Sequence, residues 1–132
     1  MIYANLVIAN PARGELKPMP VRALVDTGSA HLCIPRSVQL QLGLTRLDER
    51  QVVLPDGRST VVDYVGPVAI GFATRTSFAG ALVIGEQVLL GTIALADLDL
   101  VVRVREGDVV VNGDSPNIPV SGALPQRNKA RR

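Results

Sequence analysis

Short apolar runs separated by turn residues recur along most of the 132-residue chain. Runs of this kind, bounded by Gly, Pro, Asn and Asp, are typical of β-strands. The pattern therefore predicts an all-β domain. The expected strands are residues 2–9, 16–25, 31–34, 51–54, 59–65, 67–72, 76–84, 88–90, 100–104 and 109–112.

Turn sequences join three pairs of these runs into predicted hairpins. Pro-Asp-Gly-Arg at residues 55–58 is the clearest, because Asp-Gly between two β-prone runs is a strong hairpin signal. Ala-Thr-Arg at 73–75 and Glu-Gly at 106–107 connect the other two pairs.

Two short segments fit a helix. Thr92 is predicted to cap a helix over 92–98, because a Thr side chain satisfies backbone N–H groups of a first helical turn. Pro35 suits the first turn of a helix over 36–42, and Gly43 suits its end. In that second segment the apolar residues lie at every other position, which instead fits a strand. The sequence thus predicts one short helix near 92–98 and leaves 36–42 undecided.

The composition limits how the core is built and where the domain ends. The chain is 47% hydrophobic but only 3% aromatic, so Val, Leu, Ile and Ala must fill the core. A chain of this length suffices for one domain. From Gly113 onward, three Pro, two Gly and four basic residues predict a loop or a disordered tail. Residues 1–112 are therefore expected to form the domain, and 113–132 a Pro-rich basic tail.

Charge and cysteine content exclude several classes of function. The net charge of +2 comes from basic residues at 127, 129, 131 and 132, whereas residues 1–112 hold ten basic and eleven acidic side chains. A nucleic-acid partner would need basic residues clustered on the folded part, so none is expected. No apolar run approaches the about 20 residues that span a bilayer, so no membrane partner is expected. With one cysteine and no basic segment at the N-terminus, a cytoplasmic location of bacterial type is predicted.

The first candidate site follows the apolar run at 23–25. Asp26 is a poor strand residue, yet it ends this strand. Gly28 permits backbone angles that are closed to other residues. The hydroxyls of Thr27 and Ser29 can hydrogen-bond to neighbouring backbone. These residues either hold a carboxylate rigidly at the mouth of a sheet or form an ordinary capped loop between two strands.

Three motifs then follow one another in a characteristic order. The first is Leu24-Val25-Asp26-Thr27-Gly28-Ser29, which the apolar strand 31–34 follows. The second is the Asp-Gly hairpin, and the third is the segment Val88-Leu89-Leu90-Gly91. Over roughly residues 1–112, this order resembles the retropepsin-like aspartic proteases, the single-lobe relatives of retroviral proteases and pepsins. The resemblance implies a closed β-barrel of the acid protease fold, with one lobe per chain and one short helix after Gly91.

The resemblance also implies a reaction. Two carboxylates can hydrolyse an amide around one water without a metal: the ionised one takes its proton and the protonated one polarises the carbonyl. Only one Asp-Thr-Gly occurs and Asp-Ser-Gly is absent, so the partner of Asp26 must be Asp26 of a second copy. The expected protein is a C2 homodimeric aspartic endopeptidase with a peptide or protein substrate and no cofactor or metal. Apolar side chains are expected on both sides of the cleaved bond.

Individual roles follow from the same resemblance. Thr27 would hydrogen-bond across the dimer axis, and Ser29 would support the Asp26 carboxylate. Gly28 would accept a substrate N–H through its carbonyl, while the hairpin around Gly57 would close over the substrate as a flap. The expected substrate-binding residues are Gly28, Ala30, Leu54, Pro55, Asp56, Gly57 and Arg58. The second loop, which would brace the catalytic turn, comprises Leu89, Leu90 and Gly91.

The sequence departs from the retroviral pattern at two paired positions. An Asp four places after the catalytic one and an Arg after the apolar-apolar-Gly segment are replaced by Ala30 and Thr92. Losing both partners of a buried ion pair can be nearly neutral. The Pro-rich basic end is also unsuited to the shared terminal sheet of retroviral dimers, so the dimer interface is expected to be built differently.

Other interpretations remain beside the protease. A catalytically inactive dimerisation or peptide-binding module of the same fold would keep the motifs without turnover. His31 and Cys33 would share one face of a strand, as a Cys–His nucleophile requires, but the apolar run around Cys33 favours a buried thiol. A single His excludes a His-rich metal site. Asp97 and Asp99 are interpreted as loop or helix-end charges.

Overall fold

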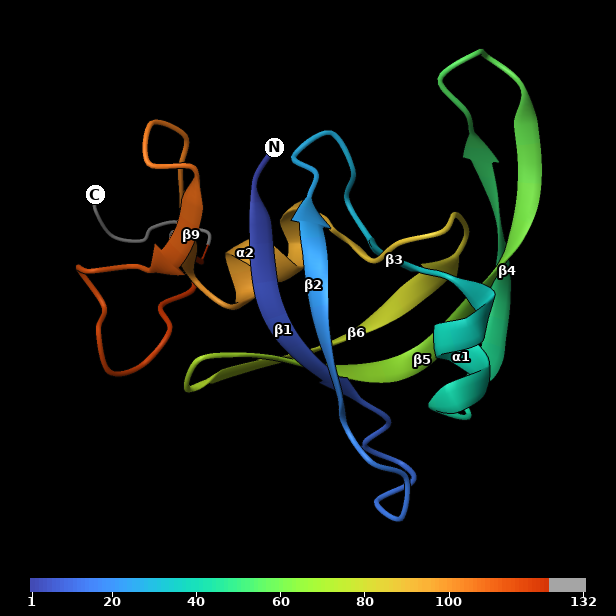
Figure 1. The fold of residues 1–132 in the computed structure, drawn as a ribbon, viewed down its shortest axis with the longest axis horizontal. Helices are drawn as coiled ribbons and strands as arrows, with labels where there is room; N and C mark the ends of the chain where they lie inside the picture. Colours follow the sequence, from blue (N-terminus) through green and yellow to red (C-terminus); the bar gives the residue numbers. More distant parts are fainter. Residues whose placement is uncertain (124–132) are drawn as a thin grey trace, which may run out of the picture.

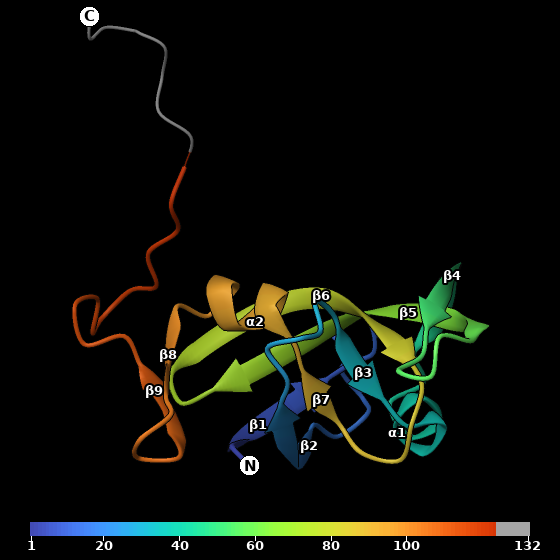
Figure 2. The same ribbon diagram turned by 90° about the horizontal axis from the view of Figure 1, so that it is seen from above.

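The computed structural model describes residues 1–123, which form a β-barrel extended by a two-stranded hairpin (Figures 1 and 2). The predicted all-β class is confirmed. The strands are β1 (Tyr3–Ala9), β2 (Met19–Val25), β3 (Leu32–Ile34), β4 (Thr45–Val53), β5 (Ser59–Phe72), β6 (Arg75–Val83), β7 (Leu89–Leu90), β8 (Leu100–Arg103) and β9 (Asp108–Val111). The helices are α1 (Arg36–Gln41) and α2 (Thr92–Asp97).

Six strands close the barrel. The strands of the main sheet are ordered β1-β2-β7-β3-β6-β5-β4, and β1 also pairs with β5. That additional pairing joins the sheet to itself and leaves β4 outside the ring, paired with β5. This closure confirms the predicted closed barrel.

The interior of the barrel is aliphatic because alternate residues of each strand point inward. In β1, Ala4, Leu6 and Ile8 are buried while Asn5 and Val7 are exposed. Each fully buried Leu or Ile stabilises the fold by about 2 kcal/mol. The core also contains Ala23, Leu32, Ile34, Val38, Leu42, Leu44, Val65, Val68, Ile70, Ala81, Val88, Leu90, Ala94, Leu95, Leu98 and Val109.

The two strands expected at 59–65 and 67–72 are one strand, β5, so this prediction is wrong. The Gly-Pro pair at 66–67 predicted a break between two strands, but β5 continues through it. The pairing with β6 shifts register between Val65 and Val68. Gly66, at φ +152°, permits this irregularity because it carries no side chain. As a result, one continuous strand links the barrel to the β4–β5 hairpin.

The undecided segment 36–42 forms helix α1 over Arg36–Gln41 with Leu42 as its C-cap, so residues 1–123 contain two short helices where the sequence predicted one. Val38 and Leu42 lie one turn apart and are both buried, whereas Leu40 is 68% exposed. Gly43 follows at φ +59° and ends the helix as expected. Neither helix in residues 1–123 is long and apolar enough to cross a membrane.

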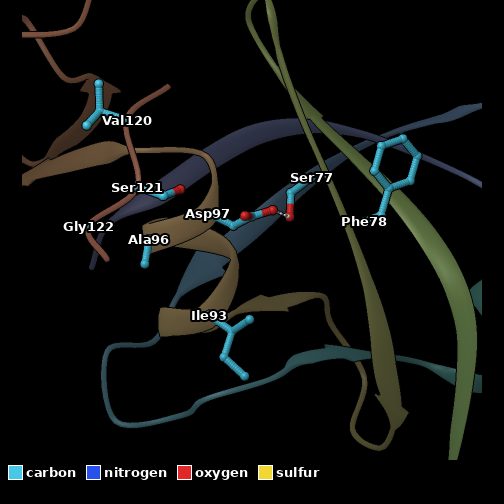
Figure 3. A pocket seen from close by; sticks show the side chains of 8 residues that line it. All are labelled: Ser77, Phe78, Ile93, Ala96, Asp97, Val120, Ser121 and Gly122. Carbon is cyan, nitrogen blue, oxygen red and sulfur yellow. Dashed lines mark hydrogen bonds between the residues drawn. The ribbon is translucent and has the colours of Figure 1, made fainter. Parts of the chain in front are cut away.

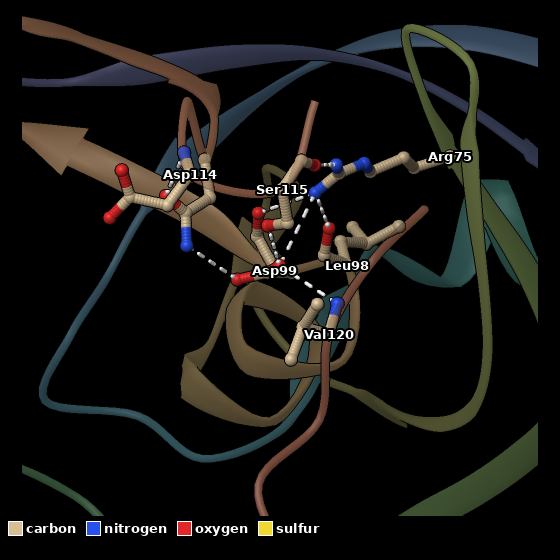
Figure 4. Close-up of polar contacts among 7 residues, drawn as sticks. Arg75, Leu98, Asp99, Asp114, Ser115 and Val120 are labelled. Atoms are coloured by element: carbon tan, nitrogen blue, oxygen red, sulfur yellow. Dashed lines mark hydrogen bonds and ion pairs between the residues drawn. The ribbon is translucent and has the colours of Figure 1, made fainter. Parts of the chain in front are cut away.

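Arg75 was expected in a turn but begins β6 and is buried. The turn before it is tighter than predicted, with Ala73 at φ +52°. The Arg75 guanidinium donates to the carbonyl oxygens of Leu98 (3.1 Å), Asp99 (2.7 Å) and Ser115 (Figure 4). It also lies 3.7 Å from the Asp99 carboxylate. We call this pair of residues the Arg75–Asp99 clasp.

Asp99 is more than the helix-end charge that the sequence predicted. Its carboxylate accepts hydrogen bonds from the Ser115 hydroxyl, the Asn112 side chain (3.1 Å) and the Val120 N–H (2.8 Å). These donors, with a smaller contribution from the Arg75 charge, lower the pKa of Asp99 to about 2. Residues 113–123 contain no helix or strand, and residues 124–132 of the predicted tail lie outside the described residues. Ser115 is buried, and its bonds to Arg75 and Asp99 hold this segment on the barrel.

Candidate active site

Asp26 stands directly after β2, at the start of the turn that leads into β3. β7 lies between these two strands: it runs parallel to β2, with Val25 opposite Leu90, and antiparallel to β3, with Cys33 opposite Leu89. The Asp26 N–H donates to the Leu90 carbonyl oxygen at 3.0 Å. The fold thus brings the first and third sequence motifs into direct contact.

The Asp26 turn, residues 26–31, is ordered by its own backbone. The Gly28 N–H donates to Asp26 Oδ1 at 3.0 Å, and the Ser29 N–H donates to the Asp26 carbonyl oxygen at 3.2 Å. The Ser29 hydroxyl donates to the His31 carbonyl oxygen (3.5 Å), so in the single chain Gly28 rather than Ser29 supports the carboxylate. Asp26 is partly buried, while Thr27 and Gly28 are exposed.

Helix α2 holds the far side of the Asp26 turn. Thr92 and Ile93 donate their backbone N–H groups to the carbonyl oxygens of Ser29 (2.9 Å) and Ala30 (3.0 Å). The turn therefore satisfies N–H groups at the start of the helix, and the N-cap is Gly91 with no side-chain cap, not Thr92 as predicted.

Gly91 makes this approach possible. A Cβ atom on Gly91 would lie 2.6 Å from the carbonyl groups of Ala30 and His31, which is closer than real Cβ atoms come to backbone. The segment Leu89-Leu90-Gly91, predicted as the second loop, therefore contacts the Asp26 turn through its backbone. Leu89 and Leu90 are hydrophobic, and Gly91 has no side chain to keep the turn away.

The β4–β5 hairpin carries the other predicted substrate-binding residues. Its tip is closed by hydrogen bonds from Leu54 N–H to the Arg58 carbonyl oxygen (2.7 Å) and from Gly57 N–H to the Leu54 carbonyl oxygen (2.9 Å). The Arg58 N–H and guanidinium both donate to Asp56, and they lower the pKa of the Asp56 carboxyl. Pro55 is exposed at the same tip.

This hairpin stands apart from the Asp26 turn in the single chain. It projects beyond the barrel at the same end as the turn, with the turn lying between it and the β8–β9 hairpin (Figures 1 and 2). Among residues 1–123, no hydrogen bond joins the tip of the hairpin to the Asp26 turn.

Cys33 is a buried thiol, as predicted. Burial, with a smaller contribution from the Asp26 charge, raises the pKa of the Cys33 thiol. The His31 ring packs edge-on against Tyr64, with 5.8 Å between ring centroids, and the Arg50 guanidinium covers the Tyr64 ring at 4.0 Å. His31 is thus engaged with an aromatic ring, and the structure gives no support to a Cys–His nucleophile.

Two of the pockets on the surface differ in their relation to the Asp26 turn. One of about 520 Å³ lies between β6 and α2, where the Ser77 hydroxyl donates to Asp97 at 2.5 Å (Figure 3). No residue of the Asp26 turn lines it. The other, of about 410 Å³, includes Thr27 itself and is otherwise lined by Met1, Ile2, Val25, Val102, Val104 and Gly107. We call this second pocket the hairpin notch.

Sequence reasoning did not single out the residues that shape the notch or the clasp. Val102 and Val104 fit the alternating apolar pattern that any predicted hairpin shows, so nothing in the sequence marked them as pocket residues. Arg75 resembled a turn residue, and nothing local distinguished Asp99 from Asp97.

A single barrel with one Asp-Thr-Gly turn, braced by an apolar-apolar-Gly segment, defines the class of single-lobe acid proteases. A family model described as aspartyl protease matches residues 12–93, which is more than half of the chain. The chain belongs to the aspartyl protease family. This confirms the family resemblance that the order of the motifs predicted.

One solved structure is similar over nearly the full length. The retroviral protease-like domain of Ddi1 from Leishmania major superposes with a TM-score of 0.55 at 14% identity, covering 97% of this chain and 98% of that one. At this identity the likeness concerns the fold. A comparison with curated protein sequences gave no match.

Proposed function

We propose that the protein is an aspartic endopeptidase that hydrolyses peptide bonds through Asp26 and the Asp26 of a second copy. The observation that carries the proposal is the fixed Asp26 carboxylate. Its turn is held by Leu90 from one side and by the start of α2 from the other, and its Oδ1 accepts the Gly28 N–H. A carboxylate fixed in this way is preorganised for chemistry.

The reaction needs two such carboxylates because one group cannot act as base and acid at the same time. Two close carboxylates cannot both ionise, so the pair shares one proton. The ionised Asp26 takes a proton from water, and the protonated one donates a hydrogen bond to the carbonyl oxygen of the substrate. The attacking water oxygen then forms the tetrahedral intermediate, and protonation of the leaving nitrogen breaks the C–N bond.

The surrounding residues supply binding. The exposed Gly28 leaves its backbone accessible for a substrate strand, over which the β4–β5 hairpin closes as a flap in this proposal. Ala30 brings no charge to the edge of the site, where the retroviral pattern has an acid. The substrate is therefore held there by backbone contacts, and apolar side chains are expected on both sides of the cleaved bond.

The experiment is cleavage of a diverse peptide library by the wild type and by Asp26→Asn, from about pH 3 to 8, the range in which a coupled carboxylate pair titrates. The proposal expects cleavage by the wild type, none by Asp26→Asn, and an acidic optimum with loss of rate on both sides. Asn keeps the shape of Asp, so both proteins should show the same melting temperature and oligomeric state. Equal cleavage by the two proteins would remove Asp26 from the mechanism.

The same experiment addresses the inactive-module alternative. A peptide-binding module would bind library members without cutting them, and Asp26→Asn would change neither the dimer nor the absence of products. Absence of cleavage by a wild type that is dimeric across the pH range would favour that function over catalysis.

A further inference from the structure

We propose that Tyr64 positions the Asp26 turn by holding His31, the last residue of that turn, against the base of the β4–β5 hairpin. The inference rests on the proposed function, in which Asp26 is catalytic, and deepens it by naming a residue outside the three motifs on which the rate depends. Tyr64 is a positioning residue, because it acts on Asp26 through His31 and contacts no reacting atom.

A row of side chains crosses the sheet from the Asp26 turn to the hairpin. The strand order places β6 between β3 and β5, with β4 on the far side of β5. His31 stands immediately before β3, Tyr64 lies on β5 and Arg50 on β4. The rings of His31 and Tyr64 are 5.8 Å apart at 84°, and the Arg50 guanidinium lies 4.0 Å from the centre of the Tyr64 ring. Tyr64 therefore contacts the turn on one side and the hairpin partner strand on the other.

Gly80 on β6 opens the path between Tyr64 and His31. Two strands that flank a third have their backbones about 10 Å apart, so the two rings meet over β6. A Cβ atom on Gly80 would lie 2.1 Å from Cζ of Tyr64 and 2.2 Å from its hydroxyl oxygen. The Tyr64 ring thus lies directly on the Gly80 backbone, and any side chain at this position would displace the ring.

His31 is also held on its backbone side. A Cβ atom on Gly91 would lie 2.6 Å from the His31 carbonyl oxygen, and the Ser29 hydroxyl donates to the same oxygen at 3.5 Å. With Tyr64 against the ring and Gly91 against the carbonyl, His31 has little room to move. Because the start of the turn is bonded to β7 at Asp26, fixing His31 fixes the opposite end of the same segment.

Arg50 holds Tyr64 from the hairpin side. Asp48 of β4 pairs directly with Tyr64, and Arg50 lies two residues further along the strand, so the three side chains share one face of the hairpin. The Arg50 guanidinium lies 3.5 Å from the Asp48 carboxylate, and the negative face of the aromatic ring attracts it as well. The base of the hairpin and the Asp26 turn are therefore joined through one ring.

The first measurement is peptide cleavage by the full chain. Tyr64→Leu removes the ring, and we expect kcat to fall about tenfold with KM nearly unchanged, because the turn loses its position while the substrate contacts remain. Tyr64→Phe keeps the ring and should cleave like the wild type. Tyr3→Leu is the matched control, since Tyr3 also lies under an arginine, Arg22 at 3.7 Å, but stands on β1.

Gly80→Ala moves the ring without deleting it. Gly80 does not have a positive φ, so alanine brings only the contact with Tyr64. We expect Gly80→Ala to lower kcat as Tyr64→Leu does. The double variant should lose no more than Tyr64→Leu alone, because leucine has no atom at the Cζ and hydroxyl positions that the new methyl group would meet. Thermal melts establish that each variant is folded.

Two NMR readouts report the turn without any substrate. His31 is the only histidine in the chain, so its ring signals are unique, and the ring current of Tyr64 shifts them. The Ile93 N–H, which donates to the Ala30 carbonyl oxygen beside His31, reports the position of the turn by hydrogen exchange. In Tyr64→Leu the His31 signals should move, and Ile93 should exchange about tenfold faster relative to Leu42 in α1. Tyr64→Phe and Tyr3→Leu should match the wild type.

Unchanged His31 signals and Ile93 exchange in Tyr64→Leu would overturn the inference. A rise in KM with an unchanged kcat would also overturn it, because Tyr64 would then contact the substrate directly. A wild type that cuts no peptide counts against the endopeptidase, and the NMR readouts then decide on Tyr64 alone. Equal cleavage by the wild type and Tyr64→Leu leaves the endopeptidase standing and removes Tyr64 as a positioning residue.

Discussion

The backbone N–H of Asp26 donates to the carbonyl oxygen of Leu90 at 3.0 Å, although the two residues belong to motifs far apart in the sequence. Through this bond β7 fixes the start of the Asp26 turn, while the first N–H groups of α2 fix its end at Ser29 and Ala30. The candidate catalytic carboxylate is thus positioned by backbone contacts, so the residues that allow close backbone approach are expected to be the most sensitive to substitution.

Gly91→Ala tests this directly. The new Cβ would lie 2.6 Å from the carbonyl groups of Ala30 and His31, so the turn or the helix must move. We expect a loss of about 1–3 kcal/mol in the free energy of unfolding and a fall of about a hundredfold in kcat/KM. Urea unfolding and peptide cleavage measure the two effects.

Gly14→Ala is the matched control for Gly91→Ala. A Cβ on Gly14 would meet nothing within 4 Å. Its stability should stay within about 0.5 kcal/mol of the wild type, with unchanged cleavage. An active, stable Gly91→Ala protein would show that the contact between the turn and α2 does not position Asp26.

Gly57 at the tip of the β4–β5 hairpin tests the proposed flap. It has φ +88°, and an added Cβ would meet nothing within 4 Å, so only the backbone conformation limits a substitution. Val is strained there by about 1–2 kcal/mol, whereas Asn adopts such angles more readily. We expect Gly57→Val to lower kcat/KM clearly and Gly57→Asn to retain most of it, and the backbone strain should give Gly57→Val the lower melting temperature of the two. If Gly57→Val cleaves as fast as the wild type, the tip takes no part in catalysis.

The lowered pKa of Asp99 predicts that the stability of the fold depends on pH. Its pKa falls from an ordinary 3.8 to about 2 in the folded protein, so folding favours the ionised carboxylate. The stability that Asp99 contributes is present in full above its unfolded pKa and is lost as the pH falls through the folded one. Asp99→Asn should therefore melt below the wild type at neutral pH, and the difference should shrink on acidification toward pH 2.

The matched control for Asp99 is Asp114→Asn, which makes the same chemical change at an exposed residue. Thermal unfolding of the three proteins over an acidic pH series isolates the Asp99 contribution from those of other carboxylates. A gap between Asp99→Asn and the wild type that stays constant with pH would contradict the assigned role of the Ser115, Val120 and Asn112 hydrogen bonds.

The sequence by itself determined the fold class, the family and the candidate carboxylate. Alternating apolar positions and turn residues are local signals, and they placed most strands and the hairpin at 55–58 correctly. The order of the motifs around Asp26, Gly57 and Leu90 pointed to the barrel before any contact was known. These features are legible because a strand or a turn is set by residues that are neighbours in the chain.

Tertiary structure decided the rest. Gly66 reads as a break, yet pairing with β6 carries β5 through it. Thr92 reads as a helix cap, yet the turn at Ser29 satisfies the helix from outside. Arg75 reads as a turn residue, yet it is buried against Asp99, because burial and partnership depend on groups that only the folded chain brings together.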